Sequence, residues 1–160
     1  MLRESKLGNK MEKTARVIIY NDGNIPNALN LKEGYICVKR TKCIGGNINT
    51  YYTIPGGHVE AGETAEIAAL REIKEELSID IEIVDTLMNL YNSHLIRDEV
   101  FYVGKYKSGL LQNGDGPEFT NPDIDKYGTY EIVCVSKDEI KDINLVPLEV
   151  KMEILKNVER

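Results

Sequence analysis

Three glutamates in the middle of the chain have the residue type and spacing of a metal-binding site. Glu72, Glu75 and Glu76 lie in a segment that runs from Gly57 to Ile79 and reads GHVEAGETAEIAALREIKEELSI. On an α-helix, at about 100° per residue, Glu75 and Glu76 fall near 300° and 40° when Glu72 is placed at zero. The three carboxylates then share an arc of roughly 100° and repel one another. We therefore expect a bound cation to neutralise this face.

The ligand type restricts the cation. Hard carboxylate oxygens select Mg²⁺ or Mn²⁺ over softer metals. Beside a diphosphate bridge, such an ion neutralises charge, aligns the bridge and acidifies a bound water. The alternative interpretation is an acidic helix face that is merely solvated. The pattern therefore favours phosphate chemistry that depends on a divalent cation.

The helix that carries these glutamates is predicted to run from about Thr64, a suitable N-cap residue, to Leu77. Four large apolar residues fall between about 100° and 220° on the same wheel. We expect them to pack on a core while the opposite face holds the carboxylates; they are Ile67, Leu70, Ile73 and Leu77. Small residues flank the carboxylates, either to leave room for cation and phosphate or to favour the helix; they are Ala65, Ala68 and Ala69.

The whole segment resembles the signature of the Nudix hydrolases, G-x5-E-x7-R-E-U-x-E-E-x-G-U, in which U is a bulky apolar residue. Gly57 opens the match, Glu63 follows after five residues, 71–76 (REIKEE) fills the centre and Ile79 closes it. Ser78 is the single departure, because the family usually has Gly there. That Gly ends the helix with positive φ, so Ser78 is expected to add modest strain or to change how the helix ends.

The resemblance implies a metal site and a catalytic set. The family positions that match Glu72, Glu75 and Glu76 bind the metal, and the backbone carbonyl at Gly57 adds a ligand. Only glycine allows such a close approach of the backbone without strain. Glu72 and Glu75 are accordingly predicted to be catalytic as well as metal-binding residues.

Arg71, Glu63 and Glu118 complete the predicted catalytic set. In the family, the residue at the position of Arg71 orients a carboxylate through a bidentate ion pair; a plain surface salt bridge is the alternative. Glu63 is expected to hold a ligating water or a second metal, or else to add favourable charge near the helix N-terminus. Glu118, in the loop 108–125, is the candidate base or additional ligand, with Asp98 and Glu99 in reserve.

Composition sets the broad class. The 160 residues are 42% apolar and 29% charged, which is ordinary for one globular domain with a real core. The net charge of −6 argues against duplex nucleic acid as a partner. Three cysteines without CxxC spacing predict neither a disulfide framework nor a zinc site, and favour a reducing, cytoplasmic setting. No apolar run reaches the length of a membrane span.

The order of elements predicts an α/β protein with a mixed sheet between helices. Strands are expected over 14–20, 35–40, 50–54, 80–90, 99–107 and 127–135, with a short helix after Ser136 and a last helix that starts at Pro147. This is also the α/β/α sandwich that the Nudix resemblance implies. Residues 1–10 are predicted to be an extension, disordered or otherwise, before a single domain over 11–160.

The predicted function is hydrolysis of the diphosphate bridge in a nucleoside diphosphate that is linked to another group. A (d)NTP or a modified nucleotide is the expected substrate, and the protein is expected to be a monomer or a homodimer. One alternative is a non-catalytic domain of the same fold that binds a nucleotide or regulates a partner. Another is an isomerase of this fold, with catalytic residues of its own. His58 is a candidate phosphate contact, and candidates for base stacking are Tyr51, Phe119 and Tyr127.

Overall fold

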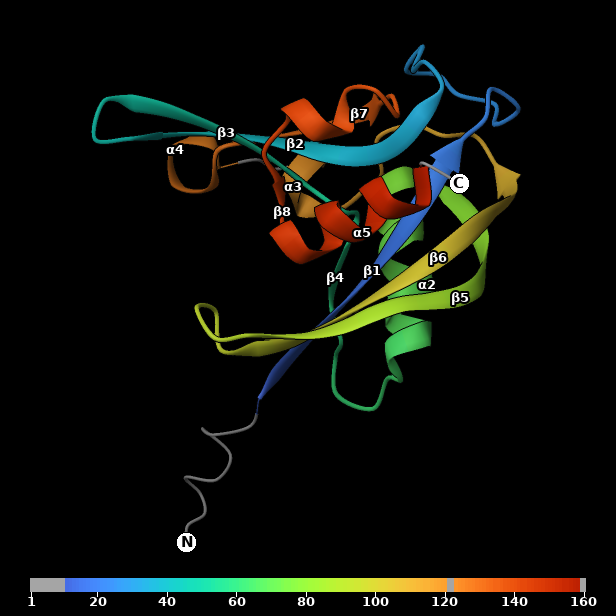
Figure 1. Ribbon diagram of the computed structural model, residues 1–160, viewed down its shortest axis with the longest axis horizontal. Helices are drawn as coiled ribbons and strands as arrows, with labels where there is room; N and C mark the ends of the chain where they lie inside the picture. The colour runs from blue at the N-terminus through green and yellow to red at the C-terminus, as the bar shows by residue number, and fades with distance from the viewer. Residues whose placement is uncertain (1–10, 121–122, 159–160) are drawn as a thin grey trace, which may run out of the picture.

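A curled mixed sheet organises the chain (Figure 1). The computed structural model describes residues 11–120 and 123–158, so the predicted N-terminal extension lies outside the described residues. The strand order is β5-β6-β1-β2-β3-β8, with β4 beside β1 and β7 beside β2. The strands are β1 (Glu12–Asn21), β2 (Gly34–Ile44), β3 (Asn47–Thr53), β4 (Gly56–His58), β5 (Ile79–Asn92), β6 (Arg97–Gly109), β7 (Thr129–Val135) and β8 (Leu145–Val146).

Both strand directions occur in this sheet. β1 runs parallel to β6 and β3 runs parallel to β8, whereas the other pairs are antiparallel. β1 and β2 pair only where Tyr20 faces Tyr35 and Asn21 faces Gly34. The sheet is therefore two halves that meet at the end of β1, and the cleft described below lies where these halves diverge.

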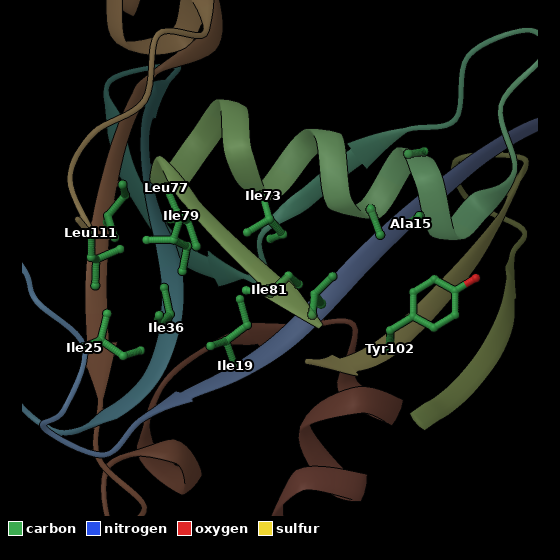
Figure 2. Close-up of a cluster of buried hydrophobic side chains, with 14 of the residues drawn as sticks. Ala15, Ile19, Ile25, Ile36, Ile73, Leu77, Ile79, Ile81, Tyr102 and Leu111 are labelled. Atoms are coloured by element: carbon green, nitrogen blue, oxygen red, sulfur yellow. The ribbon is translucent and has the colours of Figure 1, made fainter. Parts of the chain in front are cut away.

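Two helices cover opposite faces of the sheet. In Figure 1, α5 (Leu148–Val158) lies in front of it and α2 (Ala65–Leu77) lies behind it. The alternation along β1 explains this layering, because Val17 and Ile19 pack with α2 whereas Ile18 packs with α5. Figure 2 shows the cluster beneath α2, including Ile73 and Leu77. The prediction of a mixed α/β fold with layers of helix, sheet and helix is confirmed.

The predicted strands all exist, with ends shifted by a few residues. The extended loop expected over 108–125 is wrong in part. β6 continues to Gly109, Leu111 bridges to Asn27, and two short helices follow, α3 (Pro117–Thr120) and α4 (Ile124–Tyr127). Ser136 begins a capping box as predicted, but only the 3₁₀ turn η1 (Ile140–Asp142) follows it. Turn-forming residues therefore predicted where a strand or helix ends better than they predicted which element follows.

The rotation of α2 about its axis differs from the prediction. Ile67 and Leu70 are 55% and 40% exposed, whereas Ala68 and Ala69 are fully buried. Small side chains let the helix approach the sheet closely, so Ala68 and Ala69 face inward together with Ile73 and Leu77, whereas Ile67 and Leu70 do not. Glu72 and Glu76 share the alanine side and line the cleft, whereas the Glu75 side chain is 43% exposed and pairs with Arg71. The structure gives Ala68 and Ala69 a role that differs from both of the predicted ones, because they pack in the core.

Candidate active site

A glycine turn and two glutamates form the centre of the candidate site. The backbone N–H of Gly56 donates a hydrogen bond to Glu76 Oε1 at 2.8 Å. A Cβ atom added at Gly57 would lie 2.3 Å from Glu72 Oε1. A side chain at Gly57 would therefore collide with the carboxylate. Together, β4 and α2 bring Glu72 and Glu76 to the same turn.

The two ends of α2 fix the position of these carboxylates. At the start, Thr64 Oγ1 accepts a hydrogen bond from the N–H of Ile67 at 3.2 Å, as the sequence predicts for an N-cap. At the end, Ser78 adopts a left-handed conformation with φ of 63°, and its N–H donates to the carbonyl of Lys74. The helix thus ends as it would with glycine, and Ser78 carries the conformational strain that glycine would avoid.

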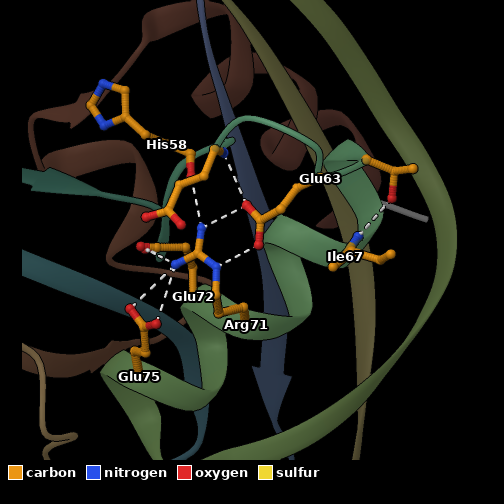
Figure 3. Close-up of polar contacts among 8 residues, drawn as sticks. His58, Glu63, Ile67, Arg71, Glu72 and Glu75 are labelled. Atoms are coloured by element: carbon orange, nitrogen blue, oxygen red, sulfur yellow. Dashed lines mark hydrogen bonds and ion pairs between the residues drawn. The ribbon is translucent and has the colours of Figure 1, made fainter.

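Arg71 gathers a second group of carboxylates on the solvent side of α2 (Figure 3). It donates to both oxygens of Glu63, with Nε 2.7 Å from Oε2 and Nη2 2.9 Å from Oε1. Nη1 lies 3.2 Å from Glu75 Oε2, and Nη2 donates to the carbonyl of His58 at 3.0 Å. The bidentate pair predicted for Arg71 exists, and its partner is Glu63. This pairing lowers the pKa of Glu63 to about 2.

Glu72 and Glu76 line a cleft of about 450 Å³ between the two halves of the sheet. Arg16 of β1 is a mostly buried cation whose positive charge acts on Glu76, and its Nη1 donates to the carbonyl of Ile54 at 2.9 Å. The other residues lining the cleft come from strands and loops far apart in the sequence: Val38, Arg40, Tyr51, Thr53, Gly56, His58, Leu95, Arg97, Glu118, Tyr130 and Val146.

The cleft disfavours charge on both glutamates when no cation is bound. Burial raises the pKa of Glu76 to about 8, although Arg16 opposes the rise. Burial also raises the pKa of Glu72 to about 6; Glu75 and Glu118 add to the rise, and Arg71 opposes it. A divalent cation would supply the positive charge that this part of the cleft lacks.

The donor set fits such a cation. Glu72 Oε2 is buried and has no hydrogen-bond partner, and the nearby donors are all carboxylate oxygens. Within residues 11–120 and 123–158, however, no three acidic, histidine or cysteine side chains form a group that could hold a metal. Glu75 interacts with Arg71 instead. Its role as a ligand stays a prediction, and it requires Glu75 to exchange the guanidinium for the cation.

Glu118, predicted from its loop alone, does lie at the cleft. Its charge acts on both Glu72 and Glu76. The two reserve candidates lie elsewhere. Glu99 is buried beneath the cleft, where its carboxylate accepts from Thr14, Asn92 and Arg97. Asp98 is exposed and lines a separate depression. The geometry therefore favours Glu118 over both.

Aromatic and histidine candidates divide between the cleft and other places. Tyr51 lines the cleft, and His58 lies at its rim, with its ring nitrogen 3.4 Å from Glu12. Phe119 packs against the core beneath α2, and Tyr127 is exposed outside the cleft lining. Tyr51 is thus the stacking candidate that the structure retains.

Sequence reasoning missed several residues of the cleft wall, and Arg40, Tyr130 and Arg16 are three of them. Arg40 lies over the ring of Tyr130, with Cζ 3.7 Å from the centroid, and 5.7 Å from that of Tyr51. Its Nη2 also donates to the carbonyl of Tyr127 at 2.6 Å. Arg16 is the third. An arginine at the third residue of an apolar strand was a usable signal for it, because burial of that side of β1 forces Arg16 to find partners.

Comparison with known proteins shows the protein family of this chain. A model of the NUDIX domain matches residues 13–149. The chain therefore belongs to the Nudix hydrolase family, and the family prediction is confirmed. The prediction of a hydrolase that acts on phosphorus-containing anhydrides is confirmed at the same level.

Individual relatives share the family but differ in their printed activities. An 8-oxo-dGTP diphosphatase of Proteus vulgaris is 29% identical over 52% of this chain and 83% of its own length. An ADP-ribose pyrophosphatase of Methanocaldococcus jannaschii is 50% identical over 40% of each chain. A Nudix-family hydrolase structure from Clostridium perfringens superposes with a TM-score of 0.59 at 12% identity, covering 94% of this chain and 97% of that one. The last match shows the fold alone.

Within the part of the chain that the structure describes, no helix is long and apolar enough to cross a bilayer.

Proposed function

We propose that this Nudix hydrolase cleaves a diphosphate bridge in a nucleotide derivative and depends on Mg²⁺ or Mn²⁺. One observation carries the proposal: Glu72 and Glu76 converge on the Gly56–Gly57 turn, and Glu72 Oε2 is buried there without a hydrogen-bond partner, 3.7 Å from Arg71 Nη1. An orphaned buried carboxylate oxygen is costly for a fold that binds nothing. It is useful to a fold that binds a cation and a phosphate.

Glu72 and Glu76 would hold the cation, with Glu75 and the carbonyl of Gly57 as further ligands. When bound, a divalent cation neutralises the bridge and lowers the pKa of water. Arg71 keeps Glu63 and Glu75 in place from the solvent side. Glu63 is then a positioning residue, and any contact it makes with a ligating water is indirect.

Glu118 is the proposed general base. It faces the two buried glutamates across the cleft, and a carboxylate there can take the proton of an attacking water. Glu118→Gln should lower kcat by at least about a hundredfold, within the usual range for a general base, and KM should change much less. Glu131 is exposed on the neighbouring strand β7, so Glu131→Gln is the matched control.

The substrate is proposed to be a (d)NTP or a modified nucleotide. The relative from Proteus vulgaris, named as an 8-oxo-dGTP diphosphatase, supports this class. The wall of the cleft formed by Tyr51, Arg40 and Tyr130 offers flat faces suited to a base. The relative from Methanocaldococcus jannaschii favours ADP-ribose as the second candidate. Free Cys37, Cys43 and Cys134 support a reducing, cytoplasmic compartment.

A substrate panel in H₂¹⁸O tests the proposal directly. The purified protein is incubated with dGTP, 8-oxo-dGTP and ADP-ribose, with Mg²⁺, with Mn²⁺ and with EDTA. We expect cleavage only with metal and ¹⁸O in a phosphate product, because water attacks phosphorus. Full activity in EDTA, or label only outside the phosphate products, would contradict it. Saturable binding without turnover would favour the non-catalytic alternative.

A further inference from the structure

The segment that carries Glu118 is attached to the end of the metal-site helix. An α-helix leaves its last carbonyls without intrahelical partners. Here the N–H of Gln112 donates to the carbonyl of Leu77 at 3.2 Å, and the N–H of Gly114 donates to that of Glu76 at 2.9 Å. Two orphan carbonyls at the end of α2 are thus satisfied by one stretch of backbone. We call residues 112–116 the strap.

Glycines allow the strap to make this contact. A Cβ atom added at Gly114 would lie 1.5 Å from the carbonyl oxygen of Glu75, and the nearest atoms it would meet all belong to the backbone of α2, which cannot give way. A Cβ atom added at Gly116 would lie 2.3 Å from Glu118 Oε1. The first glycine therefore lets the strap touch α2. The second makes room for the carboxylate of Glu118 to fold back over the strap.

The far side of the strap is fixed as well. The N–H of Phe119 donates to the carbonyl of Gly116 at 3.0 Å, and its ring packs on the core beneath α2. That ring also meets Tyr130 edge-on, with centroids 6.4 Å apart. Glu118 is therefore held between a backbone contact with α2 on one side and a core residue on the other.

We propose that Gly114 is a positioning residue, which ties Glu118 to the same helix that presents Glu72 and Glu76. This inference rests on the proposed function, because it assigns Gly114 an effect on turnover through Glu118. The strap makes the base and the metal ligands one rigid unit. Displacing the strap moves the base relative to the metal site without removing any charged group.

A double-mutant cycle with Gly114→Ala and Glu118→Gln tests the inference. With dGTP and Mg²⁺, or with ADP-ribose if the panel selects it, Gly114→Ala should lower kcat at least tenfold with little change in KM. In the Glu118→Gln background, the same substitution should have almost no further effect, because the base is already absent. Asn113→Ala changes an exposed neighbouring side chain and is the control. Thermal unfolding checks that each variant is folded.

Several outcomes would overturn the inference. Losses that multiply in the double mutant would mean that Gly114 acts on something other than Glu118. A lower unfolding midpoint with unchanged kcat would make Gly114 merely structural. If Gly114→Ala does not fold, Gln112→Pro removes the other strap hydrogen bond, and the same cycle is run with that variant. An inactive wild type would instead contradict the proposed function, so the two failures are distinguishable.

Discussion

The two sides of α2 treat their carboxylates in opposite ways. On the solvent side, Arg71 pairs with Glu63 and Glu75, and the pKa of Glu63 falls to about 2. On the cleft side, burial dominates, and the pKa values of Glu72 and Glu76 rise to about 6 and about 8. Glutamates of one short motif therefore differ in pKa because the rest of the fold places different groups beside them.

The difference separates support from chemistry. A carboxylate that is already paired with an arginine binds a cation less readily, because its oxygens are occupied by the guanidinium. A buried carboxylate whose oxygen has no partner keeps its capacity for a cation. The arrangement thus reserves the cleft side for a ligand and uses the solvent side to hold the helix and the turn together.

The largest expected effect is on turnover. Glu76→Gln should lower kcat with Mg²⁺ on the order of a thousandfold, the scale seen when a main electrostatic group of an active site is lost. Glu75→Gln should have a comparable effect if the cation draws Glu75 away from Arg71. The exposed Glu66→Gln, on the first turn of the same helix, is the control. Near-normal turnover of Glu75→Gln alone would confine the metal site to the cleft side.

In the absence of metal, the free energy of unfolding should change with pH in opposite directions for the glutamates of the two sides. The raised pKa of Glu76 means that the unfolded chain releases this proton near pH 4.5 and the folded protein near pH 8. The contribution of Glu76 to the free energy of unfolding is therefore fully present below about pH 4.5 and is lost as the pH rises to about 8. The loss amounts to a few kcal/mol at most. Urea unfolding in EDTA should show this decline. Glu76→Gln should flatten it, and a decline that persists in Glu76→Gln would assign it to other groups.

The solvent side should respond to acid instead. Because the pKa of Glu63 is lowered, its contribution is present above about pH 4.5 and is lost as the pH falls toward 2. Arg71→Lys keeps the charge but removes the planar two-pronged contact, so it should weaken this acid dependence and slightly destabilise the protein. Urea unfolding between pH 2 and 6 measures both. If the acid dependence of stability is unchanged in Arg71→Lys, the charge of the ion pair, rather than its two-pronged geometry, causes it.

The sequence predicted the helix but not its orientation. Thr64 and Ser78 act locally, so the N-cap and the left-handed end follow from a few adjacent residues. Which side of α2 faces the sheet depends on β1 and β4, and apolar volume alone pointed to Ile67 and Leu70. Ala68 and Ala69 face the sheet because their small side chains let the helix and the sheet approach closely. That choice is decided by packing between distant segments, which periodicity along one segment does not contain.

The candidate site shows the same division. The sequence predicted a bidentate carboxylate pair for Arg71 but did not name Glu63 as the partner, although both lie in one short motif. Arg16 could not be assigned to the site, because β4 brings the turn at Gly56 next to β1 only through long-range pairing. Glu118 was found because its loop is long, but the strap that holds it rests on Gly114, whose role appears only when the end of α2 is seen against it.

The smallest expected effect comes from Ser78, between the two sides at the end of α2. Its φ of 63° suits glycine, and for other residues this conformation carries strain of about 1 kcal/mol. The Ser78 hydroxyl lies 3.5 Å from the carbonyl of Asn113, too long to offset that strain. Ser78→Gly should therefore raise the free energy of unfolding by up to about 1 kcal/mol, reduced by the extra freedom of glycine in the unfolded chain.

Turnover should not change in Ser78→Gly, because the hydrogen bonds from Gln112 and Gly114 to α2 involve backbone atoms alone. The control is Ser93→Gly, in the exposed loop between β5 and β6, because Ser93 itself does not have a positive φ. Urea unfolding and kcat are measured for both variants. A loss of kcat in Ser78→Gly without loss of stability would show that the serine holds the strap. The end of α2 would then contribute to catalysis together with the cleft side of the helix.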